Sequence, residues 1–422
     1  MTKINIQTYG CSSNFSDSEV MYGLLRKAGF QISDIGDAYI VIINACTVKG
    51  NSNVLRNLKK IASEYPYKKI ILAGCVTPDL MNEAGEIAEF SVITTHNIRD
   101  IVSVVEETLN DNYVEEAEKN EYEKINLPRI RKNPIVSIIP ISSGCVSKCS
   151  YCSVRLIKGE LFSYPSESII AEAKKSIEDG CRELWITSQD TPAYGMDWDG
   201  KSHLPELLKK LTELEGNFLI RLGMGNPHNF IPIADELIEI FRNRKMFRFL
   251  HVPLQSGSDE ILAMMNRKYS AGQFMKLIEK FRKGIPKLTL STDIICGFPG
   301  ETEEQFQESL DLINNLRPDV LNISRFQARP GTAAAGMDSQ IEGRIIKERS
   351  RKVTSAFDWI AFDTNRNWKK WKGTVIIDEQ GKNGTWIARN IYYKPVIVRG
   401  DYKLGDVVNV EIKDITKYDL RA

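Results

Sequence analysis

Three cysteines near the middle of the chain are the residues best suited to chemistry. The segment GCVSKCSYCS, residues 144–153, places Cys145, Cys149 and Cys152 at the spacing C-x3-C-x2-C, with no other Cys or His within twenty residues. A structural zinc site takes four protein ligands. Iron also binds thiolates, and a 4Fe-4S cube held by three cysteines leaves one iron free. Three cysteines packed in a core would be a plainer interpretation, but three of the eight in the chain fall within eight residues. The spacing therefore predicts an open iron–sulfur cluster.

This spacing resembles that of the radical S-adenosylmethionine (SAM) enzymes, in which the open iron chelates the amino and carboxylate groups of SAM. Tyr151 adds to the likeness, because the superfamily usually has an aromatic residue just before the third cysteine. The resemblance implies that Cys145, Cys149 and Cys152 hold a SAM-cleaving cluster and that Tyr151 belongs to the cofactor site.

Three further cysteines each end an apolar run within residues 1–110. The runs are INIQTYGC, YIVIINAC and KIILAGC, and they end at Cys11, Cys46 and Cys75. Helical patterns separate them, which predicts a doubly wound parallel sheet. Such sheets bind ligands beyond the carboxyl ends of their strands, and neighbouring strands lie about 4.8 Å apart. A buried Cys is common as a small apolar residue, but three at equivalent strand ends predict a second three-cysteine cluster.

Composition favours a globular protein of two or three domains. The 422 residues are 42% hydrophobic and 26% charged, with a formal net charge of +1, so any nucleic-acid site must be local. No run of 18 apolar residues could cross a membrane, and the start MTKINIQTYGC lacks the features of a signal peptide. We expect a cytoplasmic location, where thiols stay reduced.

Two more regions follow the first. Residues 111–130 are charged and poor in large apolar side chains, which predicts a linker. Residues 131–362 contain six alternating strand and helix patterns, which predict a partial (β/α)6 barrel with its chemistry on the loops after the strands. The first cysteine triad directly follows the first of these strands.

Residues 364–422 change to short β-like runs separated by turn residues, which predict a small antiparallel β-barrel. This region holds 12 Lys and Arg against 7 Asp and Glu, a local net charge of +5. Its aromatic residues are expected mainly to fill the small core, while the charge favours binding of single-stranded nucleic acid. The aromatic residues in question are Trp368, Trp371, Trp386, Tyr392 and Tyr393.

End to end, the chain resembles the methylthiotransferases, radical SAM enzymes with an N-terminal three-cysteine domain and a C-terminal TRAM domain. The sequences of its motifs are most similar to those of the archaeal and eukaryotic branch that modifies N6-threonylcarbamoyladenosine in tRNA. The segments that carry the resemblance are TYGCSSNFSDSE, NACTVKG, AGCV, SQDTPAYG, LQSGSDEIL, MNRKYS, DIICGFPGETEEQF and RFQARPGT.

The resemblance implies two 4Fe-4S clusters, SAM as cofactor, and addition of a methylthio group to C2 of the modified adenosine at position 37, beside the anticodon. One SAM would supply a radical and another a methyl group, while Cys11, Cys46 and Cys75 would hold the auxiliary cluster that delivers sulfur. The implied partners are the tRNA anticodon stem-loop, a low-potential electron donor such as flavodoxin or ferredoxin, and a source of sulfur. Cys181 and Cys296 receive no role and are expected to be packing residues.

SAM contacts are expected at the ends of barrel strands. Ser188, Gln189 and Asp190 follow the second strand, where the superfamily usually has a motif for the methionine amino group, here altered. Arg221 could pair with the SAM carboxylate, and Gln255 with Ser256 could face the ribose. GFPGET, residues 297–302, lacks the Lys and spacing of a P-loop and is expected to be a loop near the adenine.

Three other functions remain open. A methylthiotransferase acting on an aspartate of a basic ribosomal protein would favour an acidic C-terminal barrel, whereas this one is net positive. Charge cannot separate this chain from a methylthiotransferase that acts on isopentenyladenosine in tRNA, and only the sequences of the motifs favour the threonylcarbamoyl substrate. A non-catalytic two-cluster RNA-binding redox sensor would not cleave SAM. The basic stretch GRIIKERSRK, residues 343–352, could add RNA contacts, although such a helix face is often simply solvated.

Overall fold

The computed structural model describes residues 1–46 and 51–422. Part of the motif NACTVKG, residues 47–50, therefore lies outside the described residues. The chain divides into two compact units, which are considered separately. The first comprises Met1–Lys132, Ile138–Cys145 and Ser153–Glu172, and the second comprises Asn133–Ser137, Val146–Cys152 and Ala173–Ala422.

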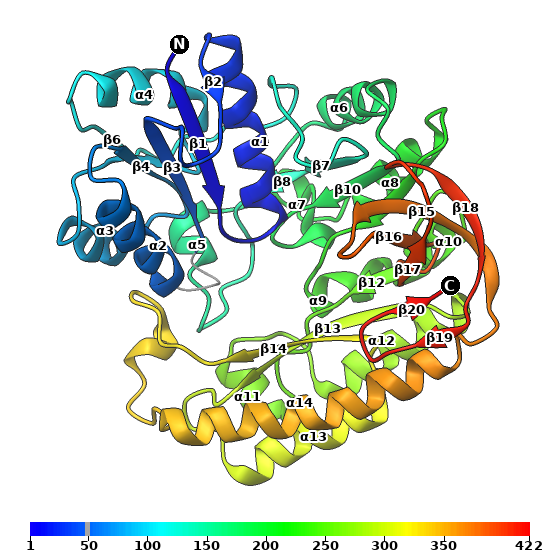
Figure 1. The fold of residues 1–422 in the computed structure, drawn as a ribbon. Helices are drawn as coiled ribbons and strands as arrows, with labels where there is room; N and C mark the ends of the chain where they lie inside the picture. Colours follow the sequence, from blue (N-terminus) through cyan, green and yellow to red (C-terminus); the bar gives the residue numbers. More distant parts are fainter. Residues whose placement is uncertain (47–50) are drawn as a thin grey trace. The chain divides into compact units, whose positions relative to one another are not determined.

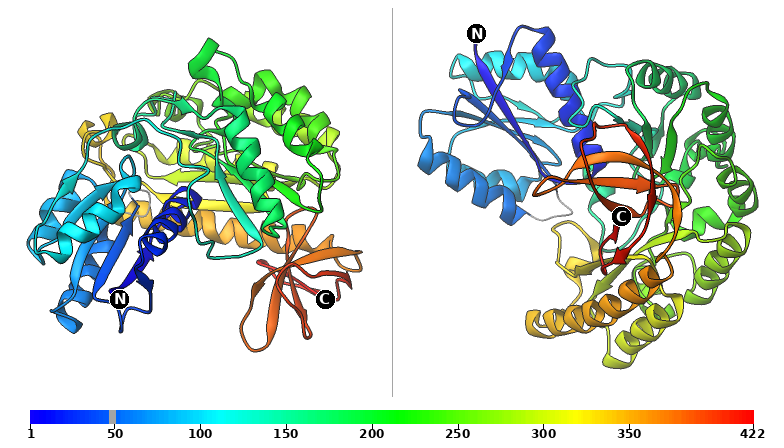
Figure 2. Two further views of the ribbon diagram at one scale, coloured as in Figure 1. Left: turned by 90° about the horizontal axis from the view of Figure 1, so that it is seen from above. Right: turned by 45° about the vertical axis from the view of Figure 1, so that its right-hand side comes forward.

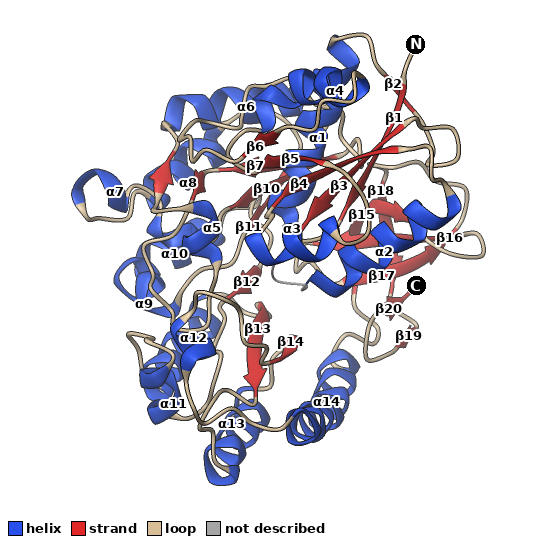
Figure 3. Ribbon diagram, turned by 90° about the vertical axis from the view of Figure 1, so that its left-hand side faces the viewer, coloured by secondary structure: helices blue, strands red, loops and turns tan. Residues whose placement is uncertain are grey.

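The first unit is built on a parallel sheet with the order β2-β1-β3-β4-β5-β6 (Figure 3). Its strands are β1 (Lys3–Thr8), β2 (Gln31–Ile32), β3 (Ile40–Ala45), β4 (Lys69–Gly74), β5 (Ser91–Thr94) and β6 (Glu115–Glu116). Its main helices are α1 (Ser12–Lys27), α2 (Asn51–Glu64), α3 (Pro78–Gly85) and α4 (Ile101–Leu109). The central strands β3 and β4 are buried on both faces, as their continuous apolar runs predict.

Helices cover both faces of this sheet. Val20 and Met21 of α1 and Val104 of α4 pack on one face, whereas Leu58 of α2 and Leu80 of α3 pack on the other. The doubly wound expectation is therefore confirmed.

Residues 111–130, which were expected to form a linker, pack against the first unit in part. Within them β6 extends the sheet, and Lys124 and Ile125 are buried. Sequence composition missed this because most of the segment is polar and exposed.

The barrel is made of six strands in two three-stranded sheets, β11-β10-β7 and β12-β13-β14 (Figure 1). The strands are β7 (Val136–Pro140), β10 (Glu183–Thr187), β11 (Leu219–Leu222), β12 (Phe249–His251), β13 (Thr289–Cys296) and β14 (Val320–Arg325). The principal helices are α6 (Ser166–Glu178), α8 (Leu204–Glu213), α10 (Ala234–Phe241), α12 (Ala271–Gly284) and α13 (Glu303–Leu316). Short helices α7 (Met196–Asp199), α9 (Pro227–Phe230) and α11 (Asp259–Met264) lie between these strands along the chain. Helix α5 (Val154–Lys158) and the antiparallel pair β8 (Ser142–Ser143) and β9 (Phe162–Ser163) belong to the first unit. The partial barrel is confirmed.

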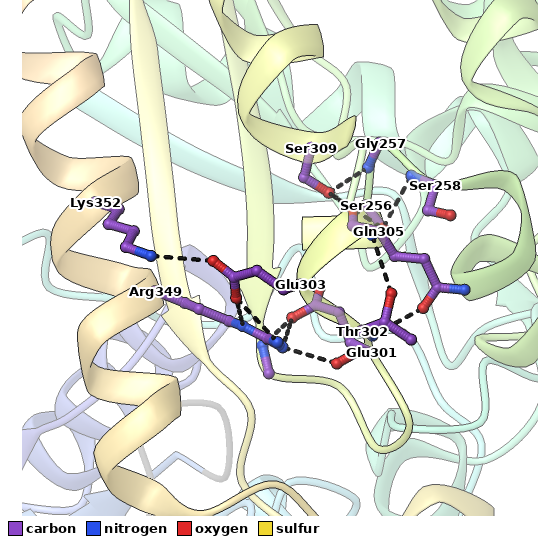
Figure 4. A network of polar contacts seen from close by, with 11 residues as sticks. Ser256, Gly257, Ser258, Glu301, Thr302, Glu303, Gln305, Ser309, Arg349 and Lys352 are labelled. Carbon is purple, nitrogen blue, oxygen red and sulfur yellow. Dashed lines mark hydrogen bonds and ion pairs between the residues drawn. The ribbon is translucent and has the colours of Figure 1, made fainter. Parts of the chain in front are cut away.

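The GFPGET loop is fixed by a buried ion pair (Figure 4). The Glu301 carboxylate accepts the Gly297 N–H at 2.9 Å and lies 2.8 Å from Arg349 of α14 (Gly343–Arg366). Arg349 also contacts Glu303, and Lys352 pairs with Glu303 at 3.0 Å. Two cations of the GRIIKERSRK stretch are therefore engaged in ion pairs within the fold, and RNA contacts from the other cations of the stretch stay a prediction.

The C-terminal region forms a curled sheet with the order β18-β15-β16-β17-β20-β19 (Figure 2). Its strands are β15 (Lys372–Gln380), β16 (Thr385–Asn390), β17 (Pro395–Arg399), β18 (Val407–Glu411), β19 (Asp414–Ile415) and β20 (Leu420–Arg421). Trp368, Trp371, Trp386 and Tyr392 belong to its core, so the expectation that the aromatic residues mostly fill the core is confirmed. Among the described residues, no helix is both long and apolar enough to span a bilayer.

Glu301→Ala should lower the free energy of unfolding by on the order of 3 kcal/mol, because it leaves the Arg349 charge buried with one partner fewer. Chemical denaturation would measure the change. Glu348→Ala, which breaks only an exposed i,i+4 pair with Lys352 on the same helix, should cost less than about 0.5 kcal/mol. Equal destabilisation in the two variants would contradict the role of the buried pair.

Candidate functional site

The loop that carries Cys149 and Cys152 is held from several sides within the second unit. Ser150 donates its N–H to Met265 O at 3.1 Å and its hydroxyl to Met264 O at 2.8 Å, and its carbonyl accepts the Ala334 N–H at 2.8 Å. Tyr151 packs against the cluster formed by Ile261, Met265, Phe298 and Ala334. The thiols therefore lie on a loop whose backbone is fixed before any ligand binds.

Arg267 is a charged group that contacts this loop. Its Nη1 lies 3.3 Å from Cys149 Sγ, its Nε donates to the Tyr269 hydroxyl at 3.0 Å, and its Nη2 donates to Pro253 O at 3.2 Å. Burial acts to lower the pKa of Arg267, but Tyr151, Tyr269 and Cys149 raise it overall. A fixed cation beside a sulfur atom favours the thiolate form that an iron ligand needs.

The second triad lies at the carboxyl ends of three adjacent strands. Cys11 is the N-cap of α1 and lies three residues after the end of β1, whereas Cys46 and Cys75 directly follow β3 and β4. Strand β3 pairs in parallel with both β1 and β4. Cys46 and Cys75 are buried while Cys11 is exposed. The neighbouring strands on which the prediction depended are therefore confirmed.

The backbone around these thiols is tightly packed. Gly10 has a φ of +134°, and a Cβ there would come within 2.6 Å of Cys46 Cβ. Asn14 donates its Nδ2 to Ala45 O at 2.7 Å, and Asn44 donates its Nδ2 to Asn14 O at 2.8 Å. Glycine is needed where the chain passes Cys46, and the paired asparagines tie the start of α1 to the end of β3.

Two buried lysines accompany the second triad. Lys158 donates to Ser13 Oγ at 2.8 Å, and Lys124 lies 3.5 Å from Asp17 and donates to Thr95 Oγ1 at 2.5 Å. Burial opposes the charge on Lys158, but Cys75 and Asp17 raise its pKa overall. Burial lowers the pKa of Lys124 to about 8 and raises that of the Cys75 thiol to about 11.

These groups fit an anionic ligand set. Two buried ammonium groups face one buried carboxylate, that of Asp17, so deprotonated thiols would supply the missing negative charge. No three His, Cys, Asp or Glu side chains in residues 1–46 and 51–422 are grouped to hold a single metal ion. A cube does not need such a group, because each thiolate binds a different iron atom.

Comparison with known proteins identifies the chain. Family models match residues 139–313 (Radical SAM superfamily), 3–94 (Uncharacterized protein family UPF0004) and 373–422 (TRAM domain). The probable threonylcarbamoyladenosine tRNA methylthiotransferase of Archaeoglobus fulgidus is 40% identical, over 98% of this chain and 96% of that protein. The threonylcarbamoyladenosine tRNA methylthiotransferase of Homo sapiens is 36% identical, over 100% of this chain and 73% of that protein. The chain belongs to this family. The resemblance drawn from the sequence is confirmed.

Solved structures support the fold of this family member. The radical S-adenosylmethionine methyltransferase TsrM from Kitasatospora setae, with tryptophan substrate and a SAM analogue bound, is 13% identical with a TM-score of 0.57. The match covers 79% of this chain and 75% of that one. At this identity the likeness shows the fold alone.

Residues 188–190 follow β10, where SAM contacts were expected. The Asp190 carboxylate accepts the Asn226 N–H at 2.8 Å and Asn229 Nδ2 at 2.7 Å, and Asn226 in turn donates to Ser147 Oγ at 3.0 Å. Asp190 therefore positions the cysteine loop through Asn226. Gln189 Oε1 is buried without a hydrogen-bond donor among the described residues, which suits an ammonium group.

The other residues expected to bind SAM have structural surroundings of their own. The Arg221 guanidinium lies about 5 Å from the rings of Trp185, Phe249 and Tyr393. The Ser256 hydroxyl accepts the Ser258 N–H at 3.2 Å and lies 3.4 Å from Ser309 Oγ (Figure 4). These contacts engage the Ser256 hydroxyl, whereas Arg221 Nε is buried without a hydrogen-bond acceptor among the described residues. The SAM roles of both residues stay predictions.

Gln255 has a φ of +77°, which is rare outside glycine. Its N–H donates to Asp293 O at 2.8 Å and its carbonyl accepts the Ile295 N–H at 3.0 Å, which link the loop after β12 to β13. Strain of this kind often accompanies a functional loop. The expected ribose contact of Gln255 also stays a prediction.

Sequence reasoning missed Arg267, Lys158 and Lys124. Arg267 belongs to the motif MNRKYS, which supported the family resemblance without indicating a role for the arginine. Lys158 follows Cys152 by six residues, and Lys124 lies in the segment expected to be a linker. The only sequence signal that could have indicated these three residues was a charged side chain in a segment predicted to be a loop.

Anaerobically reconstituted protein should bind about eight irons, four for each triad, and changing Cys145, Cys149 and Cys152 together to Ala should leave about half. Iron and sulfide analysis would measure both. Cys181→Ala is the matched control, because this buried thiol donates to Pro134 O and belongs to neither triad. Unchanged iron in the triple variant would refute the assignment of the first triad.

Proposed function

We propose that this chain adds a methylthio group to C2 of N6-threonylcarbamoyladenosine at position 37 of tRNA, using one SAM as radical source and one as methyl donor. The identity to relatives of that name over almost the whole chain carries the proposal. Two cysteine triads, each beside a cation, support it.

The residues divide the work as follows. Cys145, Cys149 and Cys152 would hold the SAM-cleaving 4Fe-4S cluster, and Cys11, Cys46 and Cys75 would hold the auxiliary one. Such clusters supply one-electron chemistry for splitting SAM and an open iron for carrying sulfur. Arg267 stabilises the Cys149 thiolate, and the loop contacts of Ser150 hold the thiols in place.

The second triad needs the same stabilisation. Lys158 offsets the charge of the Cys11, Cys46 and Cys75 thiolates, while Asp17 keeps Lys124 charged in a buried site. We propose the cytoplasm as the location, with a low-potential donor such as flavodoxin or ferredoxin and a separate sulfur source as partners.

The C-terminal region is proposed to bind the tRNA anticodon stem-loop. It cannot simply be deleted to test this, because Tyr393 packs on Phe247 and Phe249, and Lys394 pairs with Asp319 at 2.7 Å. Truncation at residue 364 would uncover these buried groups and disturb the barrel as well. Point substitutions are the sounder test.

Cys46→Ala should leave reductive cleavage of SAM near its original rate but abolish the methylthiolated nucleoside, because it removes a ligand of the auxiliary site only. Mass spectrometry of tRNA nucleosides from cells that carry each variant would measure the product, with Cys181→Ala as control. Normal product from Cys46→Ala would refute the sulfur-delivering role. Absence of the nucleoside from wild-type cells would refute the proposed function itself.

Lys382, Arg399 and Lys403 lie near one end of the C-terminal sheet, where Thr385 pairs with Arg399, and none has an ion-pair partner among the described residues. Changing all three to Gln should weaken tRNA binding and reduce the slope of log affinity against log salt by about 0.7 for each phosphate that the protein no longer binds. Fluorescence anisotropy across a salt series would measure both. An unchanged slope would exclude this end of the sheet as an RNA-binding surface.

A further inference from the structure

The outer face of α14 exposes two large aromatic rings. Trp359 is 71% exposed and Phe362 is 47% exposed, although neither lies in the C-terminal sheet. Burying such rings is normally favourable, so two of them in solvent on one helix face indicate a binding surface.

Basic residues extend the same face along the helix. Arg344, Lys347, Arg351, Trp359 and Phe362 are all exposed, and steps of three or four residues connect them through Ser355 between Arg351 and Trp359. Residues at this spacing share one side of a helix. Ile346, Arg349, Val353 and Ile360 are buried and fall on the opposite side of α14 by the same spacing. The helix packs against α13 and β14 (Figure 1).

The three cations of this face form no ion pair in the described part of the chain, and the exposed carboxylate nearest to them in sequence, that of Glu348, pairs with Lys352. No carboxylate among the described residues lies within ion-pair distance of Arg344, Lys347 or Arg351. By contrast, Arg349 and Lys352 of the same stretch are held by Glu301 and Glu303. The cations that point away from the barrel are therefore the unpaired ones.

A third exposed ring lies on a loop that is attached to α14. Lys417 pairs with Asp358 of α14 at 2.6 Å, and Asn365 donates to Thr416 O at 2.9 Å, so residues 416–418 are fixed to the helix. Tyr418, at the end of this loop, is 72% exposed. The C-terminal region and α14 thus present exposed rings from adjoining segments of one unit.

We propose that the α14 face, defined as Arg344, Lys347, Arg351, Trp359, Phe362 and Tyr418, binds a single-stranded segment of the tRNA substrate. The rings stack on unpaired bases and the cations contact phosphates. RNA is favoured over a protein partner because the two rings of α14 share one side of the helix with three cations that form no ion pair among the described residues. The inference rests on the proposed function, since it names a further surface for the same substrate.

The ring variant Trp359→Ala with Phe362→Ala should weaken tRNA binding by about five-fold to a hundred-fold for each base that loses a ring, with little change in the salt slope. Trp359→Phe with Phe362→Tyr, which keeps both rings, should retain most of the affinity. Anisotropy with unmodified tRNA transcript would measure this. Equal affinity of the Ala variant and wild type would overturn the proposal and leave a protein partner as the occupant.

The charge variant Arg344→Gln, Lys347→Gln and Arg351→Gln should instead flatten the salt slope by about 2, at about 0.7 for each phosphate. Lys174→Gln, Lys276→Gln and Lys283→Gln, three exposed lysines of α6 and α12, remove the same charge elsewhere and should change the slope little. Equal slopes for the two triple variants would also overturn the proposal, because the effect would then follow net charge alone.

Substrate-free SAM cleavage and iron content should be unchanged in every variant, which separates binding from folding and cluster assembly. Failure of the α14 face is distinguishable from failure of the proposed function. In the first case the variants bind tRNA normally and cells still contain the methylthiolated nucleoside. In the second case wild-type cells lack that nucleoside, whatever the variants bind.

Discussion

The buried charge of Lys158 constrains which groups can surround it in the first unit. An ammonium group taken out of water is costly unless negative charge lies close to it. Lys158 meets Cys75, Cys11, Cys46 and Asp17 in its surroundings, while Lys124 already shares Asp17. The site is therefore suited to thiolates. The close approach of the Gly10 backbone to Cys46 restricts the positions that these thiolates can take.

The position of the cysteines could be predicted from the sequence because it follows from topology. In a parallel sheet all carboxyl ends meet at one edge, so cysteines after three such runs converge whenever the strands are neighbours. Lys158 and Lys124 could not be found this way, since they come from α5 and from the segment at 111–130, outside the strand and helix repeat. Periodicity identifies elements, and it says little about which irregular segment folds back onto them.

The barrel shows the same limit for individual side chains. The strands and their order were predictable, but Arg221 lies opposite Trp185 in the β10–β11 register and is enclosed by Phe249 and Tyr393. Tyr393 comes from the C-terminal region, so no pattern within the barrel could reveal it. Asp190 was correctly placed at a strand end, yet its carboxylate is engaged by Asn226 and Asn229. Among the described residues, Asp190 forms no hydrogen bond with the cysteine loop itself but holds Asn226, which donates a hydrogen bond to Ser147 of that loop.

Counting charges was informative only after their partners were known. Of the 12 cations in residues 364–422, seven lie within ion-pair distance of a carboxylate and five, all among the described residues, do not. Paired cations such as Lys394, joined to Asp319, and Lys417, joined to Asp358, attach the curled sheet to the barrel strands and to α14. The unpaired cations are the ones free to contact phosphates. On α14, likewise, Arg349 is held in an ion pair, whereas Arg351 has no ion-pair partner among the described residues. A polyanion would therefore meet the cations that the fold leaves unpaired, and the ion pairs that hold the unit together would stay intact when it binds.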